Sequence, residues 1–242
     1  MNSQRTNLLL SSLSPASRDS LISRSTFVEL PLRTVLYEEE RTPRNAYFLT
    51  SGVASIITPM SNGESVEVGF IGHEGVVGGL HLLGPASPST RCMMQLAGSA
   101  FRISYSELQK TFASSDEIHM RILEFVQGHA VIVSQIAGCN RLHSAEQRLI
   151  RWLLTAQDRT QNDVLAFTQE YLAEMLATQR TSVTTIARAL QERGFISYAR
   201  GTIIILNRGG LEKAACDCYA ITKRLYVRLY GRDVPNNGSG PQ

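Results

Sequence analysis

The chain has 242 residues, of which 43% are hydrophobic, and a formal net charge of +3. This length suffices for one large or two small domains, and the composition is that of a globular protein rather than a disordered or fibrous one. No apolar run in the sequence approaches the length of a membrane span, and the N-terminus lacks the basic region and long apolar core of a secretory signal. We therefore expect a cytoplasmic protein without a membrane partner.

Two short helices, about Leu8–Leu13 and Ala16–Ser23, are expected behind a frayed N-terminal end. From Phe27 to Ile103, short β-rich runs alternate with turn-forming residues, and Asn62-Gly63 is typical of a hairpin turn. This spacing of turns predicts an antiparallel sandwich or barrel. The expected strands are Thr34–Tyr37, Ala46–Thr50, Val53–Thr58, Ser65–Ile71, Arg91–Leu96 and Ser99–Ile103.

A short helix at Tyr105–Lys110, capped by Ser104, precedes a long helix from about Asp116 to Asn140. One apolar row of the long helix recurs at alternating spacings of four and three residues, as in a coiled-coil seam. This row contains Ile118, Ile122, Phe125, His129, Ile132, Ile136, Cys139 and His143. We predict that its residues from Ile118 to Ile136 form the interface of a homodimer. The second row is expected to pack on the chain's own barrel; it contains Leu123, Val126, Ala130, Val133 and Ala137.

The next helix starts at Ser144, which forms a capping-box pattern with Gln147 three residues later. Its apolar stripe places Trp152 in the core. A polar loop is expected at Gln157–Asp163, and a final helix over about Leu211–Leu229. The tail that follows has a disordered composition.

The four cysteines are Cys92, Cys139, Cys216 and Cys218. Only the last two are close in sequence, and side chains two apart on a helix point to different faces. That spacing is not typical of a zinc site. We therefore expect all four to be small buried or incidental residues, with no metal and no cofactor.

The segment from Thr168 to Gly194 reads as two short helices joined by a tight turn. Thr168 is a good N-cap for the first helix, Thr178 for the second, and Gly194 a suitable residue after its end. Each helix carries one apolar face. These faces contain Tyr171, Leu172, Met175 and Leu176 in the first helix, and Val183, Ile186, Ala187 and Leu190 in the second.

The opposite face of the second helix carries a set of polar residues, none of which is an acid. It contains Gln179, Arg180, Thr181, Ser182, Thr184, Thr185 and Arg188. Such a face suits a DNA major groove, where arginine can bond guanine through two hydrogen bonds, although an ordinary helical hairpin with a solvated polar face is the alternative. Two strands follow, Phe195–Tyr198 and Thr202–Leu206, around a turn that carries Arg200. A helix-turn-helix followed by a hairpin is a winged helix.

The charge distribution agrees with this placement. Residues 1–143 hold 11 Lys/Arg and 12 Asp/Glu, whereas residues 144–242 hold 13 and 9. A phosphate-binding surface requires a basic excess of this kind, and the excess falls in the half that contains the helix-turn-helix.

Three stretches of this segment resemble the C-terminal domain of the Crp/Fnr family of bacterial transcription regulators: Leu172–Leu176, Arg180–Thr184 and Leu190–Ile196, with the wing Arg200–Ile205. The glycines from Gly52 to Gly78 are similar to those of the family's cyclic-nucleotide-binding barrel, so the resemblance spans roughly residues 25–208. It implies an α+β fold. The parts are an antiparallel β-roll sensor domain (1–114), a dimerisation helix (115–143), a winged helix-turn-helix domain (144–232) and a tail (233–242).

The resemblance also implies which residues contact double-stranded DNA. Arg180 is expected to read a guanine, with Thr181, Thr184 and Thr185 in the groove. Phosphate or neighbouring contacts are expected from Gln179, Ser182, Thr168, Gln169, Arg188 and Arg200. Well-known members often have an acid directly after the arginine and a second arginine four positions later, where this chain has Thr181 and Thr185. The half-site therefore need not be the familiar one. In activators of the family, the loop at Gln157–Asp163 contacts RNA polymerase.

The effector is a separate question. Family members that bind cyclic AMP use a Gly-Glu-Leu segment for the ribose and a later Arg-Ser pair for the phosphate. Here the matching residues of the pocket are Gly78, Gly79, Leu80, Ser89, Thr90 and Arg91. Gly79 replaces the glutamate, and Arg91 is one position off, which in a strand turns its side chain to the other face. The pocket is then vestigial, or takes an uncharged or different ligand. If the loop has a different length and returns Arg91 to the pocket, cyclic AMP remains a candidate effector.

The iron–sulfur sensors of the family need a cysteine cluster largely near the N-terminus, and this chain has no cysteine before Cys92. The leading interpretation is a homodimeric transcription regulator on a pseudo-palindromic site. A small-ligand-gated sensor with a minor DNA role is the second. An enzyme is the third, but the sequence shows no catalytic grouping, Walker loop or Rossmann pattern.

Overall fold

The computed structural model describes residues 6–61, 63, 65–84, 88–176 and 178–231. The chain divides into two compact units: the β-roll unit, residues 1–64 and 68–133, and the C-terminal unit, residues 65–67 and 134–242. Asn62 of the expected hairpin turn, Ala177 and the C-terminal tail lie outside the described residues.

The β-roll unit opens with α1 (Leu8–Ser11) and α2 (Pro15–Ser23), close to the expected helices. Asn7 is almost fully buried and joins α1 to the strands. Its Oδ1 accepts the hydrogen bond of the Leu10 amide at 3.0 Å, and its Nδ2 donates to the Leu49 and Gly75 carbonyls, both at 2.8 Å. One side chain therefore caps a helix and satisfies two backbone carbonyls of the roll.

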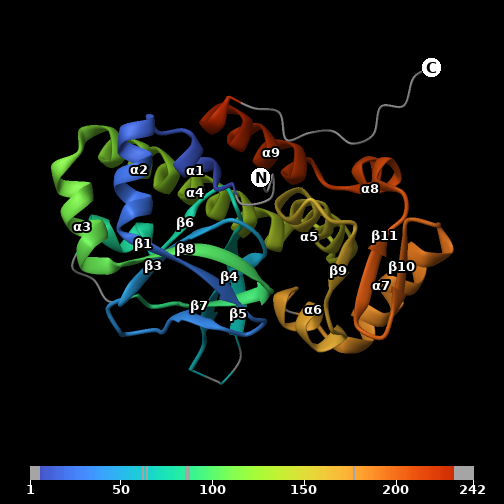
Figure 1. Ribbon diagram of the computed structural model, residues 1–242. Coiled ribbons are helices and arrows are strands. Elements are labelled where there is room, and N and C mark those ends of the chain that lie inside the picture. Colours follow the sequence, from blue (N-terminus) through green and yellow to red (C-terminus); the bar gives the residue numbers. More distant parts are fainter. Residues whose placement is uncertain (1–5, 62, 64, 85–87, 177, 232–242) are drawn as a thin grey trace, which may run out of the picture. The chain divides into compact units, whose positions relative to one another are not determined.

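Two four-stranded antiparallel sheets form the roll (Figure 1). The first has the order β1 (Ser25–Leu30), β8 (Gly98–Ser104), β3 (Asn45–Leu49) and β6 (Val76–Val77). The second has the order β2 (Val35–Tyr37), β7 (Arg91–Leu96), β4 (Val53–Pro59) and β5 (Ser65–Ile71). A 3-10 turn, η1, spans Gly79–Leu83. All six expected strands are present, and β1 and β6 are additional. Phe48, Leu49 and Met94 fill the core.

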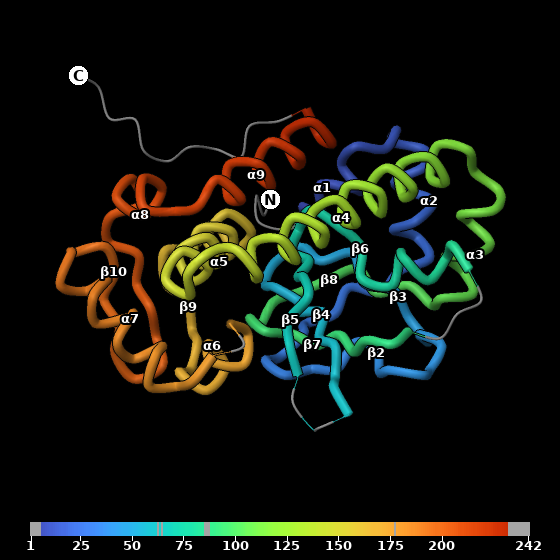
Figure 2. The backbone as a smooth tube through the Cα atoms, turned by 180° about the vertical axis from the view of Figure 1, so that it is seen from behind, coloured from blue at the N-terminus to red at the C-terminus, as the bar shows by residue number. Residues whose placement is uncertain are grey.

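Helix α3 (Tyr105–Ser114) is capped by the Ser104 hydroxyl as expected, and α4 (Asp116–Leu142) follows. Ile118, Ile122 and Phe125 are each at most 2% exposed. The Phe125 ring lies so close to the Gly75 backbone that a Cβ there would come within 2.2 Å of it, so α4 packs on its own roll through this row (Figure 2).

The prediction that the row Ile118, Ile122, Phe125, His129, Ile132 and Ile136 forms a dimer seam is therefore wrong. Its five apolar members are at most 7% exposed within a single chain, and His129 approaches Gly69 of the same roll. A side chain covered by its own chain is not available to a second subunit. Helical periodicity shows that a face is buried, but not what buries it.

The outer side of α4 is also apolar. Met120, Val131 and Leu142 are 54%, 47% and 79% exposed, and their spacing of 11 residues, about three turns, places them on one face. Among the described residues α4 is the one helix long and apolar enough to span a membrane by length and composition. The core helix of a globular protein meets the same test, and α4 has a buried apolar row of this kind.

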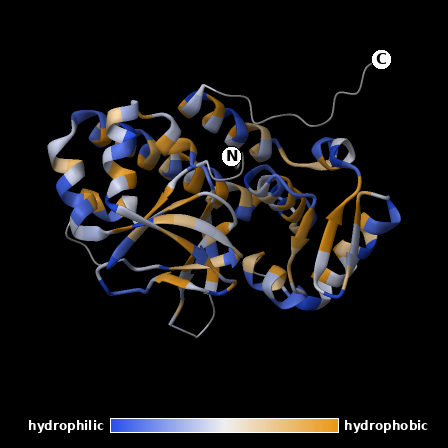
Figure 3. Cartoon of the chain, in the orientation of Figure 1, coloured by the Kyte–Doolittle hydropathy of each residue, from blue (hydrophilic) through white to orange (hydrophobic). Residues whose placement is uncertain are grey.

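In the C-terminal unit, α5 (Ala145–Thr160) begins with the expected capping box of Ser144 and Gln147, and Trp152 is buried as expected. The remaining elements are β9 (Val164–Ala166), α6 (Gln169–Met175), α7 (Arg180–Glu192), β10 (Ile196–Ala199), β11 (Thr202–Ile205), α8 (Arg208–Ala214) and α9 (Asp217–Tyr230). The order β10-β11-β9 forms a three-stranded antiparallel sheet, whose strands β9 and β11 are largely hydrophobic (Figure 3).

Two expectations fail in this unit. Gln157–Thr160 belongs to α5 instead of to a polar loop. Gln157 is buried, and its side-chain oxygen accepts a hydrogen bond from Arg208 at 2.8 Å. The expected final helix is divided into α8 and α9, since Ala215 and Cys216 adopt extended backbone conformations. The Arg208 guanidinium also donates to Asp158 Oδ1 at 2.7 Å and to the Tyr219 hydroxyl at 2.6 Å, so one side chain binds α5 to α9.

The close approach of β8 to the loop before β4 gives a stability prediction. A Cβ on Gly98 would lie 2.1 Å from the Ser51 carbonyl oxygen, and a backbone atom cannot move aside cheaply. We expect Gly98→Ala to destabilise the fold by about 2–4 kcal/mol, measured as a lowered Tm. Gly84→Ala is the matched control, because Gly84 has extended backbone and no atom within 4 Å of its Cβ position. Equal Tm values for the two variants would contradict this packing.

Candidate nucleic-acid interface, ligand cavity and cysteine cluster

Helices α6 and α7 form the expected helix-turn-helix. The Thr168 hydroxyl accepts the Tyr171 amide hydrogen bond at 3.2 Å, which confirms this N-cap. The predicted cap at Thr178 is wrong, because α7 begins one residue later with Gln179 at its N-cap and no side-chain cap bond. Val183, Ala187 and Leu190 fix α7 in the core, at most 2% exposed. Gly194 has the left-handed backbone expected after a helix end, φ +68°.

The remaining polar side chains of α7 lie on one accessible face. Gln179, Arg180, Thr181, Thr184, Thr185 and Arg188 are exposed, and Ser182 is half-buried. Thr184 Oγ1 donates to the Arg180 carbonyl and Thr185 Oγ1 to the Thr181 carbonyl, both at 3.1 Å. These hydroxyl protons are used inside the helix. The two threonines therefore present oxygen acceptors and methyl groups outward.

Arg180 stands at the N-terminus of α7 and is held by α6. Its Nη1 lies 2.6 Å from Glu170 Oε1, and its Nε donates to Gln169 Oε1 at 3.4 Å. The side chains of the ion pair are each 63% exposed, so the pair contributes little to stability. The guanidinium can leave Glu170 for an external acceptor at small cost.

The wing is a two-residue hairpin. Ala199 pairs with Thr202, and the residues between them, Arg200 and Gly201, have φ values of +49° and +76°. Positive φ at both positions is the geometry of a type I′ turn. Arg200 therefore lies exposed at the wing tip, where the sequence placed it.

The β-roll unit encloses a cavity of about 310 Å³. The lining residues are Tyr37, Ile56, Val68, Ile71, Val76, Gly78, Leu80, His81, Thr90, Phe125, Val126, His129, Ala130 and Val133. Of the six residues expected in the pocket, Gly78, Leu80 and Thr90 line it, whereas Gly79, Ser89 and Arg91 do not. Arg91 follows Thr90 along the strand, so its side chain emerges on the other face.

The described lining residues include no carboxylate, lysine or arginine. Burial raises the pKa of Tyr37, whose hydroxyl lies 3.2 Å from Thr90 Oγ1. Burial lowers the pKa of His81, which keeps its imidazole neutral at pH 7. Tyr37, Thr90 and His81 are thus uncharged polar groups on this wall, and His129 adds a second imidazole.

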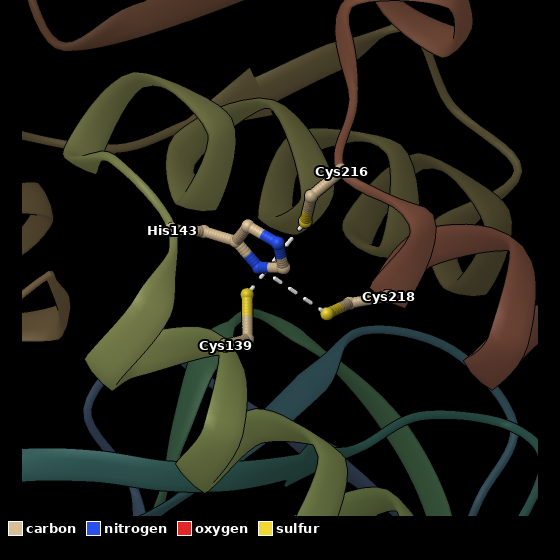
Figure 4. A group of neighbouring side chains, drawn as sticks. All are labelled: Cys139, His143, Cys216 and Cys218. Atoms are coloured by element: carbon tan, nitrogen blue, oxygen red, sulfur yellow. Dashed lines mark hydrogen bonds between the residues drawn. The ribbon is translucent and has the colours of Figure 1, made fainter.

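The C-terminal unit contains a group that the sequence interpretation missed: Cys139, His143, Cys216 and Cys218 (Figure 4). Their ligand atoms all lie within 4.8 Å of one another. The expectation that Cys216 and Cys218 point to different faces of a helix is wrong, because Cys216 is the N-cap of α9 and lies outside the helical turn that contains Cys218. The i, i+4 spacing of Cys139 and His143 was the signal available in the sequence.

Hydrogen bonding within this group shifts the pKa values of two thiols in opposite directions. The bond between Cys216 and Cys139, at an Sγ–Sγ distance of 3.7 Å, lowers the pKa of Cys139 to about 4. The same bond raises the pKa of Cys216, and burial raises the pKa of Cys218.

The comparisons with known proteins divide the chain in a corresponding way. A model described as the Crp-like helix-turn-helix domain matches residues 147–214, and a model of the cyclic nucleotide-binding domain matches residues 27–115. A search of curated proteins finds no match.

Solved structures share the fold at low sequence identity. A Crp/Fnr-family regulator from Eubacterium rectale is 15% identical, with 85% of this chain and 96% of that chain covered and a TM-score of 0.66. FixK2 from Bradyrhizobium japonicum is 16% identical, with 79% and 98% covered and a TM-score of 0.67. The regulator CLP from Xanthomonas campestris, described as responsive to c-di-GMP, is 18% identical, with 79% and 99% covered and a TM-score of 0.63.

A cyclic nucleotide-binding domain combined with a DNA-binding helix-turn-helix defines a two-domain transcription regulator. The two matched segments together cover more than half of the chain, which therefore has the domain pair and the fold of Crp/Fnr-family regulators.

Proposed function

We propose that this protein is a homodimeric, sequence-specific DNA-binding regulator that reads its site through α7. The observation that carries the proposal is the exposed face of α7 from Gln179 to Arg188, which lacks acids and has Arg180 at the N-terminal end of the helix. The N-terminal residues of a recognition helix reach base edges, and arginine there can bond guanine O6 and N7 together. The acceptors and methyl groups of Thr184 and Thr185 suit adenine or cytosine amino groups and thymine methyls.

The second copy is proposed to dock on the outer face of α4. This face carries Met120, Val131 and Leu142, exposed in the single chain. Small or short residues lie on the same side, and a Cβ added at Gly138 would meet no atom within 4 Å, so another helix can approach closely. Pairing of two copies would present two recognition helices to a pseudo-palindromic site.

The β-roll cavity is proposed to take an uncharged, largely apolar effector with a polar group for Tyr37, Thr90 or His81. Its volume of about 310 Å³ falls at the lower end of small-molecule sites. A buried cyclic phosphate requires a cation or a group of N–H donors, and the described wall offers no lysine or arginine. Phe125 and Val126 belong to α4 and line the cavity, so an occupant would contact the helix proposed for dimerisation.

RNA polymerase is the other partner that the sequence predicts. Gln161–Asp163 is the exposed part of the segment predicted to contact RNA polymerase, and that contact stays a prediction. We assign no catalytic activity to the protein. We place it in the cytoplasm, where it would bind its DNA.

Removal of the Arg180 guanidinium tests the DNA assignment. We expect Arg180→Ala to lose about 1–3 kcal/mol of specific binding and to relax one base position in each half-site, measured by selection from random DNA and by gel shift at fixed salt. Arg18→Ala, which removes the same charge from α2, is the control and should leave the selected site unchanged. If Arg180→Ala selects the same DNA site as the wild type, Arg180 does not read a base.

Dimerisation through the outer face of α4 is tested with matched valines. We expect Val131→Glu to sediment as a monomer, because it places an unpaired charge in the seam. Val35→Glu is the control, since Val35 on β2 is 46% exposed against 47% for Val131. Ile132→Glu is no test of dimerisation, because Ile132 is 4% exposed within the chain and its charge would disrupt the fold. If Val131→Glu still sediments as a dimer, the interface does not lie on the outer face of α4.

Calorimetry with cyclic AMP and cyclic GMP tests the cavity. We expect no saturable heat at millimolar nucleotide, since the described part of the wall carries no lysine or arginine for the phosphate. The uncharged fluorophore N-phenyl-1-naphthylamine serves as the positive control and should gain fluorescence on binding. Saturable nucleotide binding at micromolar affinity, with tighter DNA binding, would overturn this prediction.

A further inference from the structure

Four metal-ligand side chains converge in the C-terminal unit although they come from two distant parts of the chain. Cys139 lies in the last turn of α4, and His143, four residues later, directly follows the end of that helix. Cys216 and Cys218 lie at the start of α9. The Sγ atoms of Cys139 and Cys216 are 3.7 Å apart, and His143 Nδ1 is 3.5 Å from Cys218 Sγ (Figure 4).

These distances match the edges of a tetrahedron around one ion. Metal–sulfur bonds of about 2.3 Å and metal–nitrogen bonds of about 2.0–2.1 Å place two sulfur ligands about 3.8 Å apart, and a sulfur and a nitrogen about 3.5 Å apart. All four ligand atoms lie within 4.8 Å of one another. A four-iron cluster holds its cysteine sulfurs across the whole width of a cube, so this group is too compact for one.

The local fold sets this convergence. Residues four apart on a helix lie on one face, which brings Cys139 and His143 together. Ala215 and Cys216 are extended, which separates α8 from α9 and turns Cys216 back toward Cys218 in the first turn of α9. The three cysteines are at most 5% exposed and form a cluster of their own.

The surroundings match those of a metal site. His143 Nε2, the other ring nitrogen, lies 3.7 Å from Asp217 Oδ1, and a carboxylate at that nitrogen orients a ligating histidine. Gln135 Nε2 donates to Cys218 Sγ at 3.1 Å. The 5%-exposed Arg151 acts electrostatically on Cys139, and its buried Nε has no hydrogen-bond partner among the described residues. Three thiolates and a neutral imidazole around a divalent cation carry one net negative charge, which this guanidinium offsets.

We propose that Cys139, His143, Cys216 and Cys218 bind one Zn²⁺ ion as a Cys₃His site. Loading releases the thiol protons to solvent as three sulfur–metal bonds form. Four protein ligands leave no open position for a reacting water, so the ion is structural. It joins the end of α4 to the start of α9 and is independent of the DNA face of α7.

The test is metal analysis of the full chain, purified with a reductant and loaded with zinc or cobalt. We expect about one zinc per chain, and for cobalt the visible bands of a tetrahedral thiolate site. Cys139→Ser and Cys218→Ser should lose the ion. His143→Cys should keep it, since four cysteines also bind zinc. Cys92→Ser is the control, because Cys92 is fully buried in β7 of the β-roll and outside the group.

Several results would overturn the site. Substoichiometric zinc in the wild type together with cobalt spectra of water-coordinated ions excludes it, and this measurement stands even if the serine variants do not fold. Bound iron with acid-labile sulfide, or a Cys139–Cys216 disulfide in the reduced preparation, excludes a mononuclear ion. Equal zinc content in Cys92→Ser and Cys139→Ser places the metal elsewhere.

Discussion

The contact of α4 with its own β-roll is the constraint on which the other features depend. Ile118, Ile122 and Phe125 are buried there, and the contact is possible because Gly75 has no side chain where the Phe125 ring lies. With one face of the helix committed to the roll, its remaining apolar face at Met120, Val131 and Leu142 stays exposed. The same helix lines one side of the cavity and carries Cys139 in its last turn. A helix of 27 residues thus has a different environment on each face and at its end.

The cavity and the DNA face follow opposite electrostatic rules. The described wall of the cavity has no carboxylate, lysine or arginine, and burial holds Tyr37 and His81 in their uncharged forms. A charged ligand placed there would lose its hydration without a compensating partner. On α7, by contrast, Arg180 is exposed and only weakly held by Glu170, so its charge is available at little cost. A ligand of the roll and a ligand of α7 are therefore expected to differ in charge.

The C-terminal helices are organised by polar contacts rather than by a continuous apolar stripe. Arg208 bonds Gln157, Asp158 and Tyr219, and the Tyr219 hydroxyl in turn donates to Asp158 Oδ2 at 2.8 Å. Charge-assisted networks of this kind, here only partly buried, are strong when fully satisfied. The network fixes where α9 begins, and with it the position of Cys216 and Cys218 beside the end of α4.

The sequence by itself determined the elements whose signals are local. Caps at Ser104, Ser144 and Thr168, the turn at Arg200-Gly201 and the apolar stripe of α7 each depend on residues a few positions apart, so pattern and propensity suffice to find them. Family resemblance in the helix-turn-helix added its exposed face. Only the tertiary structure decided which side of α4 faces the roll, which of the six pocket residues reach the cavity, and that Cys139 and His143 meet Cys216 and Cys218. These depend on contacts between residues far apart in the chain, and periodicity carries no information about the partner that covers a face.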